Sequence, residues 1–130
     1  MSSKIIAIIS CVFCFTMLAS AQEFLFETNN YVEYQVGTLS FVISVAYGAR
    51  LEPSLIPNRT CNSPVYTSDA FTIETILEIK NHLFATSGCY PHLKRNKLNP
   101  NRNVADGACE NAKAETAWNE FHNFINGALS

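Results

Sequence analysis

The sequence of 130 residues lacks the local motifs by which many enzymes are recognised. It contains no Gly-x-Ser-x-Gly elbow, no His-Glu-x-x-His pattern and no glycine-rich phosphate loop. It also lacks a strong net charge, since nine Lys and Arg stand against eleven Asp and Glu. That balance argues against nucleic acid as a general partner. We therefore expect no catalytic residues, no cofactor and no metal site.

Long apolar runs are missing after the N-terminus. The first 21 residues hold an early lysine, an apolar run over 5–18 and a small-residue ending at Ala21 that suits signal peptidase. The run is shorter than the roughly 20 residues that a membrane-spanning helix needs. We therefore expect a cleaved signal peptide at 1–21 and a single small secreted domain at 22–130, with no transmembrane segment.

One strong helix pattern lies in the middle of the chain, over residues 68–89. Ser68 is a good N-cap, and Gly88 is a good residue to close the last turn. The face expected to be buried repeats at spacings of three and four and consists of Ile73, Ile76, Leu77, Lys80, Leu83 and Phe84. A second helix is predicted from Asp106 to Gly127, with its stripe at Ala114, Ala117, Trp118, Phe121 and Ile125.

Residues 30–48 fit two patterns. Large and small side chains alternate from Leu39 to Tyr47, which is typical of a half-buried strand and would make a hairpin turning at Gly37. A capping box at the start and Gly48 at the end favour a helix instead. If residues 30–48 form a helix, the protein is an all-α three-helix bundle, and this is the fold that we expect. The alternative is an α+β fold, in which an N-terminal hairpin packs on two helices.

Cleavage of the signal peptide leaves an odd number of cysteines, Cys61, Cys89 and Cys109. In an up-down-up bundle, the end of the central helix lies beside the start of the last one, so we expect a disulfide between Cys89 and Cys109. The central helix is about 28 Å long at 1.5 Å per residue, which puts Cys61 at the far end of the bundle. Cys61 is then available to link two copies into a disulfide-bonded homodimer.

The loops carry two candidate surface sites. Asn58-Arg59-Thr60 is an acceptor for N-glycosylation, so Asn58 is expected to face outward. The loop over 90–105 contains Lys94, Arg95, Lys97 and Arg102 and no acidic residue. These four cations form a candidate patch for an anionic partner such as a glycan, and Lys94-Arg95 could also be a dibasic processing site.

Ionisable residues on the central helix suggest one further site. Glu74, Glu78 and His82 recur every four residues, a row that a solvated helix face explains better than a metal site does. An enzyme would need Glu78 and His82 to converge with His122.

The leading hypothesis from the sequence is a secreted glycoprotein that binds an extracellular protein or glycan without catalysis. The alternatives are an extracellular carrier of a small apolar ligand, suggested by a surplus of phenylalanine, and a secreted hydrolase with no visible motif.

Overall fold

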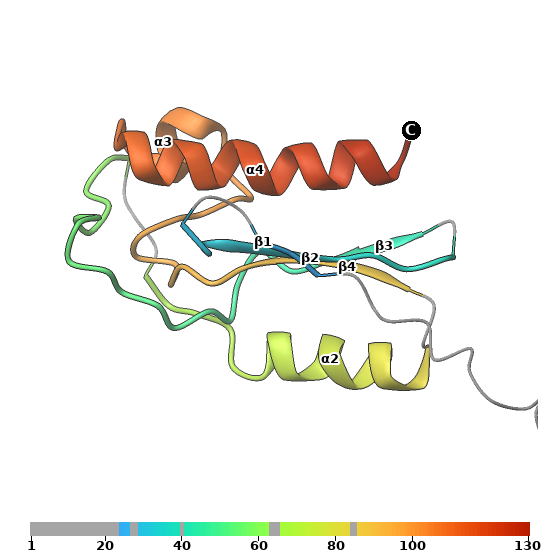
Figure 1. The fold of residues 1–130 in the computed structure, drawn as a ribbon. Coiled ribbons are helices and arrows are strands. Elements are labelled where there is room, and N and C mark those ends of the chain that lie inside the picture. The colour runs from blue at the N-terminus through green and yellow to red at the C-terminus, as the bar shows by residue number, and fades with distance from the viewer. Residues whose placement is uncertain (1–23, 27–28, 40, 63–65, 84–85) are drawn as a thin grey trace, which may run out of the picture.

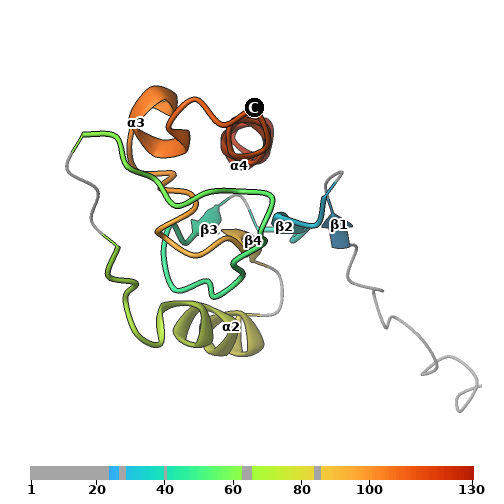
Figure 2. The same cartoon turned by 90° about the vertical axis from the view of Figure 1, so that its left-hand side faces the viewer.

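A computed structural model describes residues 24–26, 29–39, 41–62, 66–83 and 86–130. The protein is α+β, because a mixed sheet lies between α2 on one side and α3 with α4 on the other (Figures 1 and 2). The predicted three-helix bundle is therefore wrong, and the alternative α+β interpretation fits. The predicted signal peptide at 1–21 lies outside the described residues. Within the described ranges, no helix has the length and apolar character needed to cross a membrane.

The sheet has four strands in the order β1-β2-β4-β3. These are β1 (Phe24–Phe26), β2 (Val32–Gln35), β4 (Ser87–Pro91) and β3 (Val42–Ser44). β2 pairs antiparallel with both β1 and β4, whereas β3 pairs parallel with β4. The two β-strands that the hairpin alternative joins directly, β2 and β3, are thus separated by β4.

β4 explains why the pattern of residues 68–89 misleads. Helix α2 is shorter than predicted and spans Thr72–His82. It begins after Phe71, which has a left-handed backbone with φ of 63°, and not after Ser68. Gly88 does not end a helix but lies inside β4, where Gln35 pairs with it on one side and Ile43 on the other. Pairing with two strands outweighs the local preference of Gly88 for a helix end.

The last helical region consists of two helices. Helix α3 spans Val104–Ala108 and α4 spans Ala112–Ala128. Their N-caps are Asn103 and Asn111, whose side chains accept backbone hydrogen bonds, so the predicted start at Asp106 is wrong. The predicted stripe of α4 is confirmed: its alanines and Phe121 are buried, and Trp118 and Ile125 pack against the same core.

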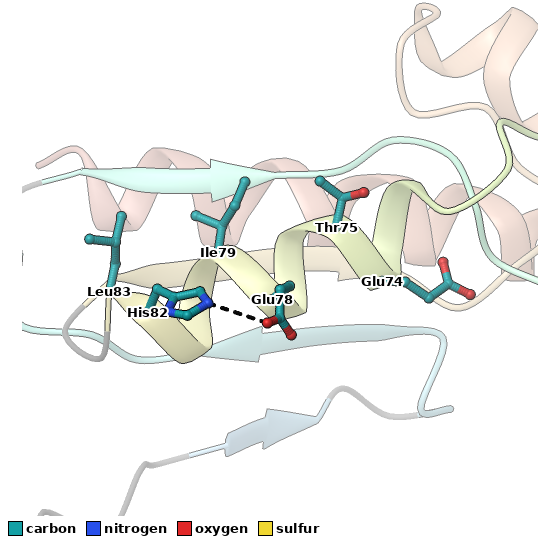
Figure 3. A pocket seen from close by; sticks show the side chains of 6 residues that line it. All are labelled: Glu74, Thr75, Glu78, Ile79, His82 and Leu83. Carbon is teal, nitrogen blue, oxygen red and sulfur yellow. Dashed lines mark ion pairs between the residues drawn. The ribbon is translucent and has the colours of Figure 1, made fainter.

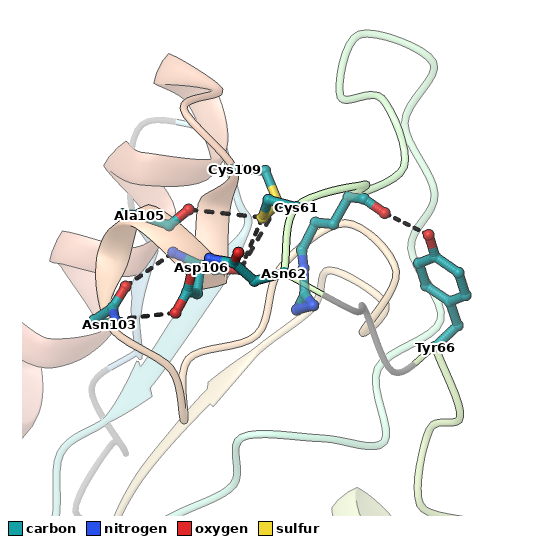
Figure 4. Close-up of a disulfide and its surroundings, with 8 residues drawn as sticks. Cys61, Asn62, Tyr66, Asn103, Ala105, Asp106 and Cys109 are labelled. Carbon is teal, nitrogen blue, oxygen red and sulfur yellow. Dashed lines mark hydrogen bonds between the residues drawn. A yellow bond between two sulfur atoms is a disulfide. The ribbon is translucent and has the colours of Figure 1, made fainter.

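The disulfide differs from the predicted one. Cys61 is bonded to Cys109, with their Cα atoms 5.7 Å apart (Figure 4). Cys89 is the free thiol among the described residues, and it is fully buried. The predicted pairing assumed that Cys89 ends a helix, whereas it lies in the central strand of the sheet under α4. The loop before α2 instead reaches α3, where Cys61 meets Cys109. Since Cys61 is already bonded, it is not available for the predicted homodimer.

Burial also determines how the unpaired thiol reacts. Desolvation raises the pKa of Cys89 to about 12, so about one molecule in ten thousand carries the thiolate at pH 8. We expect a chain beginning at Gln22 to show no reactive thiol with Ellman's reagent when native and one per chain in guanidinium chloride without reductant. A native chain that reacts at once would contradict the burial of Cys89.

Candidate functional site

The two faces of the sheet differ in polarity because side chains alternate along β2. Val32 is fully buried in the main core, and Tyr34 stacks on Phe124 of α4 with ring centroids 5.0 Å apart. The intervening residues Glu33 and Gln35 therefore belong to the opposite face, the one that α2 covers. One face thus holds the apolar core, and the other holds polar groups.

These polar groups form a connected network between α2 and the sheet. Tyr90 donates its hydroxyl hydrogen to Oε1 of Glu33 at 2.7 Å, and Oε2 of the same carboxylate is 3.2 Å from Nε2 of His92. Gln35 donates to Glu33 at 2.6 Å and also to Tyr90, and it accepts a hydrogen bond from Nζ of Lys80. We call these five residues the polar network. It links α2, β2 and β4 by side-chain contacts.

Lys80 is the only residue of α2 that is buried, with 6 % of its surface exposed. Gly88 makes room for it, because a Cβ atom at Gly88 would lie 3.0 Å from Cδ of Lys80. Burial lowers the pKa of Lys80, and Glu33 partly opposes that shift. Burial and then the hydrogen bond to Glu33 raise the pKa of Tyr90, which therefore stays neutral at physiological pH.

The outer side of α2 carries an open hollow of about 600 Å³. Thr75, Ile79 and Leu83 project from one side of the helix, and Glu78 and His82 from the neighbouring side (Figure 3). We call this surface, which also includes Glu74, the α2 groove. Ile79 and Leu83 remain 39 % and 45 % exposed. The sheet beneath α2 is polar, so the helix leaves part of its apolar surface uncovered.

The charged residues at the groove have weak partners. Glu78 lies 3.3 Å from Nε2 of His82, and Glu74 lies 3.1 Å from Nη2 of Arg50. All four side chains in these pairs are well exposed, so each pair contributes little stability. Both carboxylates can therefore exchange their partners for a cationic ligand at low cost.

A second hollow of about 510 Å³ opens at the other end of α2, beside His92. Its described lining consists of Gly48, Ala49, Arg50, Leu51, Ile73, Glu74 and His92. The Glu33–His92 pair could accept a proton there, but the described lining contains no hydroxyl or thiol to act as a nucleophile. The pair also belongs to the polar network.

The residues of the predicted enzyme site do not converge. Glu78 and His82 lie on α2, whereas His122 lies on α4 at the opposite face of the sheet (Figure 1). Nε2 of His122 is 3.1 Å from the carbonyl oxygen of Pro100, and its ring packs against Trp118. Among the described residues, no group of three or more His, Cys, Asp or Glu is placed to hold a metal ion.

Three of the four cations in the predicted anionic-partner patch have partners within the chain. Lys94 bonds to Glu52, and the buried Lys97 donates to the carbonyl oxygen of Ile56 at 2.7 Å. Arg95 lies over the ring of Tyr47, 3.9 Å from its centroid, and donates to Thr67. Arg102 is exposed. The four residues therefore do not form one solvated patch, and Lys94-Arg95 is held in place by contacts.

Asn58 is exposed, as a glycan acceptor requires, and its side-chain oxygen accepts a hydrogen bond from Asn96 at 3.0 Å. Glycosylation there stays a prediction.

Sequence reasoning missed the polar network. It noted that Lys80 shares the inner face of its helix, but it placed Tyr90 and His92 in a basic loop. A signal was present in β2, where the polar Glu33 and Gln35 alternate with Val32 and Tyr34. That alternation indicates a strand with one polar face. The sequence did not indicate that β4 is the strand that pairs with β2, because residues 87–91 have the local pattern of a helix end and a loop.

Comparisons with protein-family models, curated proteins and solved structures find no match to this chain.

Proposed function

We propose that this protein is a small secreted, non-catalytic binding protein whose α2 groove takes an amphiphilic molecule with an apolar chain and a positively charged group. The observation that carries the proposal is the half-exposed apolar side of α2, Thr75, Ile79 and Leu83, bordered by the carboxylates of Glu74 and Glu78. A volume of about 600 Å³ is in the range of small-molecule sites. The predicted signal peptide and the disulfide support an oxidising, extracellular setting.

The size of the apolar contribution follows from the exposed surface. Fully burying a Leu or Ile side chain contributes about 1.5–3 kcal/mol, and Ile79 and Leu83 are a little under half exposed. Covering both therefore contributes about 1–3 kcal/mol, or up to about a hundredfold in affinity. An ammonium group beside Glu78 adds a charge-assisted hydrogen bond and determines which amphiphiles bind.

We expect decylamine to displace Nile red from the α2 groove at a concentration about tenfold lower than decanoate, which has a similar chain and the opposite charge. Ile79→Ser with Leu83→Ser should weaken decylamine about tenfold or more. Glu78→Gln should remove most of the preference for the amine. The measurement is dye fluorescence during titration.

The matched control is Leu55→Ser, which removes an exposed leucine in the loop before α2 and should leave the displacement curve unchanged. Equal displacement by both amphiphiles would contradict the role of the carboxylates. Failure of the double serine variant to weaken either amphiphile would contradict the site itself.

An extracellular protein is the second candidate partner, supported by the edge of the sheet. β3 is an edge strand, and Leu39 and Phe41 just before it are each 43 % exposed. Edge strands can pair with an extended segment of another protein. If this surface binds the partner, Phe41→Ser should weaken the interaction, and Ile79→Ser should have little effect.

A further inference from the structure

Arg59 lies where two loops cross, and its buried guanidinium has no acidic partner in the part of the chain that the structure describes. Its backbone N–H donates to the carbonyl oxygen of Asn96 at 2.7 Å, and its own carbonyl oxygen accepts a hydrogen bond from the hydroxyl of Tyr66. The residue is 4 % exposed. Among the described residues, none hydrogen-bonds to the buried Nε and Nη1 atoms. A desolvated charge in this situation is costly unless something compensates it.

The charged groups around Arg59 increase that cost. Arg95 and Arg102 both act to disfavour its charge, and no described residue hydrogen-bonds to the buried Nε of Arg95 either. Desolvation, followed by the effect of Arg95, lowers the pKa of Arg59, but a guanidinium remains protonated at neutral pH. Arg95 belongs to the same crossing, because it donates to the carbonyl oxygen of Thr67, the residue that follows the Tyr66 bonded to Arg59.

The nearby carboxylates are engaged elsewhere. Asp106, beside the disulfide, accepts hydrogen bonds from the side chains of Asn62 and Asn103 (Figure 4). Glu52 accepts hydrogen bonds from Lys94 and Asn96. Neither acid forms an ion pair with Arg59, and no other described carboxylate does, so an anion from outside the chain is a suitable source of the compensating charge.

We infer that Arg59, Arg95 and Arg102 form a binding site for a tetrahedral oxyanion, a sulfate or phosphate group. Guanidinium groups match the oxygens of such anions, and a doubly charged anion balances more of the three positive charges than a carboxylate does. Contacts with Tyr47 and Thr67 hold Arg95 in place, so part of the site is preorganised. Arg102 is exposed and is the first cation that an entering anion meets. This site is built on loops away from α2 and is independent of the proposed groove.

The test is isothermal titration calorimetry with sodium sulfate and sodium phosphate, at an ionic strength held constant with chloride, together with the melting temperature in the same series. We expect saturable binding to the unmodified chain. Arg102→Gln should raise the dissociation constant about tenfold, and Arg59→Met should abolish binding. Arg50→Gln, which removes an exposed arginine beside α2, is the matched control and should bind as the unmodified chain does.

Sulfate stabilises many proteins by exclusion from their surface. The informative quantity is therefore how much more sulfate raises the melting temperature of the unmodified chain than that of Arg102→Gln. Without the anion, Arg59→Met should melt at a higher temperature than the unmodified chain, because it removes an uncompensated buried charge. Tighter binding of a sulfated disaccharide than of inorganic sulfate would identify a glycan as the source of the group, and the reverse order would identify the ion itself. No saturable heat with either salt, or equal binding by Arg102→Gln, would overturn the inference.

Discussion

Replacing Cys61 and Cys109 together by alanine is expected to lower the free energy of unfolding by about 4 kcal/mol. The two residues are 48 apart in sequence, so their bond closes a long loop and removes much of the entropy of the unfolded chain. The bond also holds the loop before α2 against the end of α3. Urea unfolding of the double variant, compared with the unmodified chain with and without reductant, measures the effect.

Reduction of the unmodified chain should give the same loss of stability as the double variant. Reduction of the double variant should change nothing, because Cys89 forms no disulfide with any other described residue. The intact mass of the secreted protein, measured after deglycosylation, should be that of a monomer with and without reductant. A dimer mass that disappears with reductant would contradict the pairing of Cys61 with Cys109.

Lys80→Ala is expected to lower the free energy of unfolding by about 3 kcal/mol. The change removes a buried cation from above Gly88, leaves space where its methylene groups were, and takes away the one buried side chain of α2. It also removes the positive charge that interacts favourably with the carboxylate of Glu33. Lys113→Ala, at an exposed position of α4, is the control and should change stability by less than about 0.5 kcal/mol. Loss of amide protection along α2 should accompany the loss of stability.

The pH dependence of the same contact has a definite sign. Since burial lowers the pKa of Lys80, the unfolded chain holds this proton at pH values where the folded chain has begun to lose it. The contribution of Lys80 to stability therefore rises with pH until the pH reaches the pKa of lysine in the unfolded chain. Tyr90 and Cys89 act in the opposite direction, because burial raises their pKa values. The measurement is therefore the free energy of unfolding as a function of pH, for the unmodified chain and for Lys80→Met. The rise with pH that Lys80 causes should be missing in Lys80→Met. Parallel pH profiles for the two proteins would show that Lys80 is not desolvated.

Helical periodicity was the most informative signal in the sequence. The spacing of Ala114, Ala117 and Phe121 correctly indicated the buried face of α4, because a helix packed on an apolar sheet face must repeat near 3.6 residues. The predicted inner face of α2 was correct for Lys80 but wrong for Leu77 and Leu83, which are 38 % and 45 % exposed, because the sheet face beneath α2 is polar. Phe84, also assigned to that face, lies outside the described residues. The predicted starts of both helices were wrong, because a good cap residue such as Ser68 or Asp106 can equally lie in a loop or inside a short helix. The predicted end of the last helix at Gly127 is within one residue of the observed end at Ala128.

Other features depended on contacts between residues far apart in the chain. Gly88 has the local character of a helix end, and only its pairing with Gln35 and Ile43 makes it part of a central strand. That strand buries Cys89, leaves Cys61 to pair with Cys109, and brings Tyr90 to Glu33. The sequence by itself determined the buried face of α4 and the near balance of charge, since the first depends on neighbouring residues and the second on composition. The tertiary structure alone decided the sheet order, the disulfide, the polar network and the uncompensated charge of Arg59, because each depends on which distant segments meet.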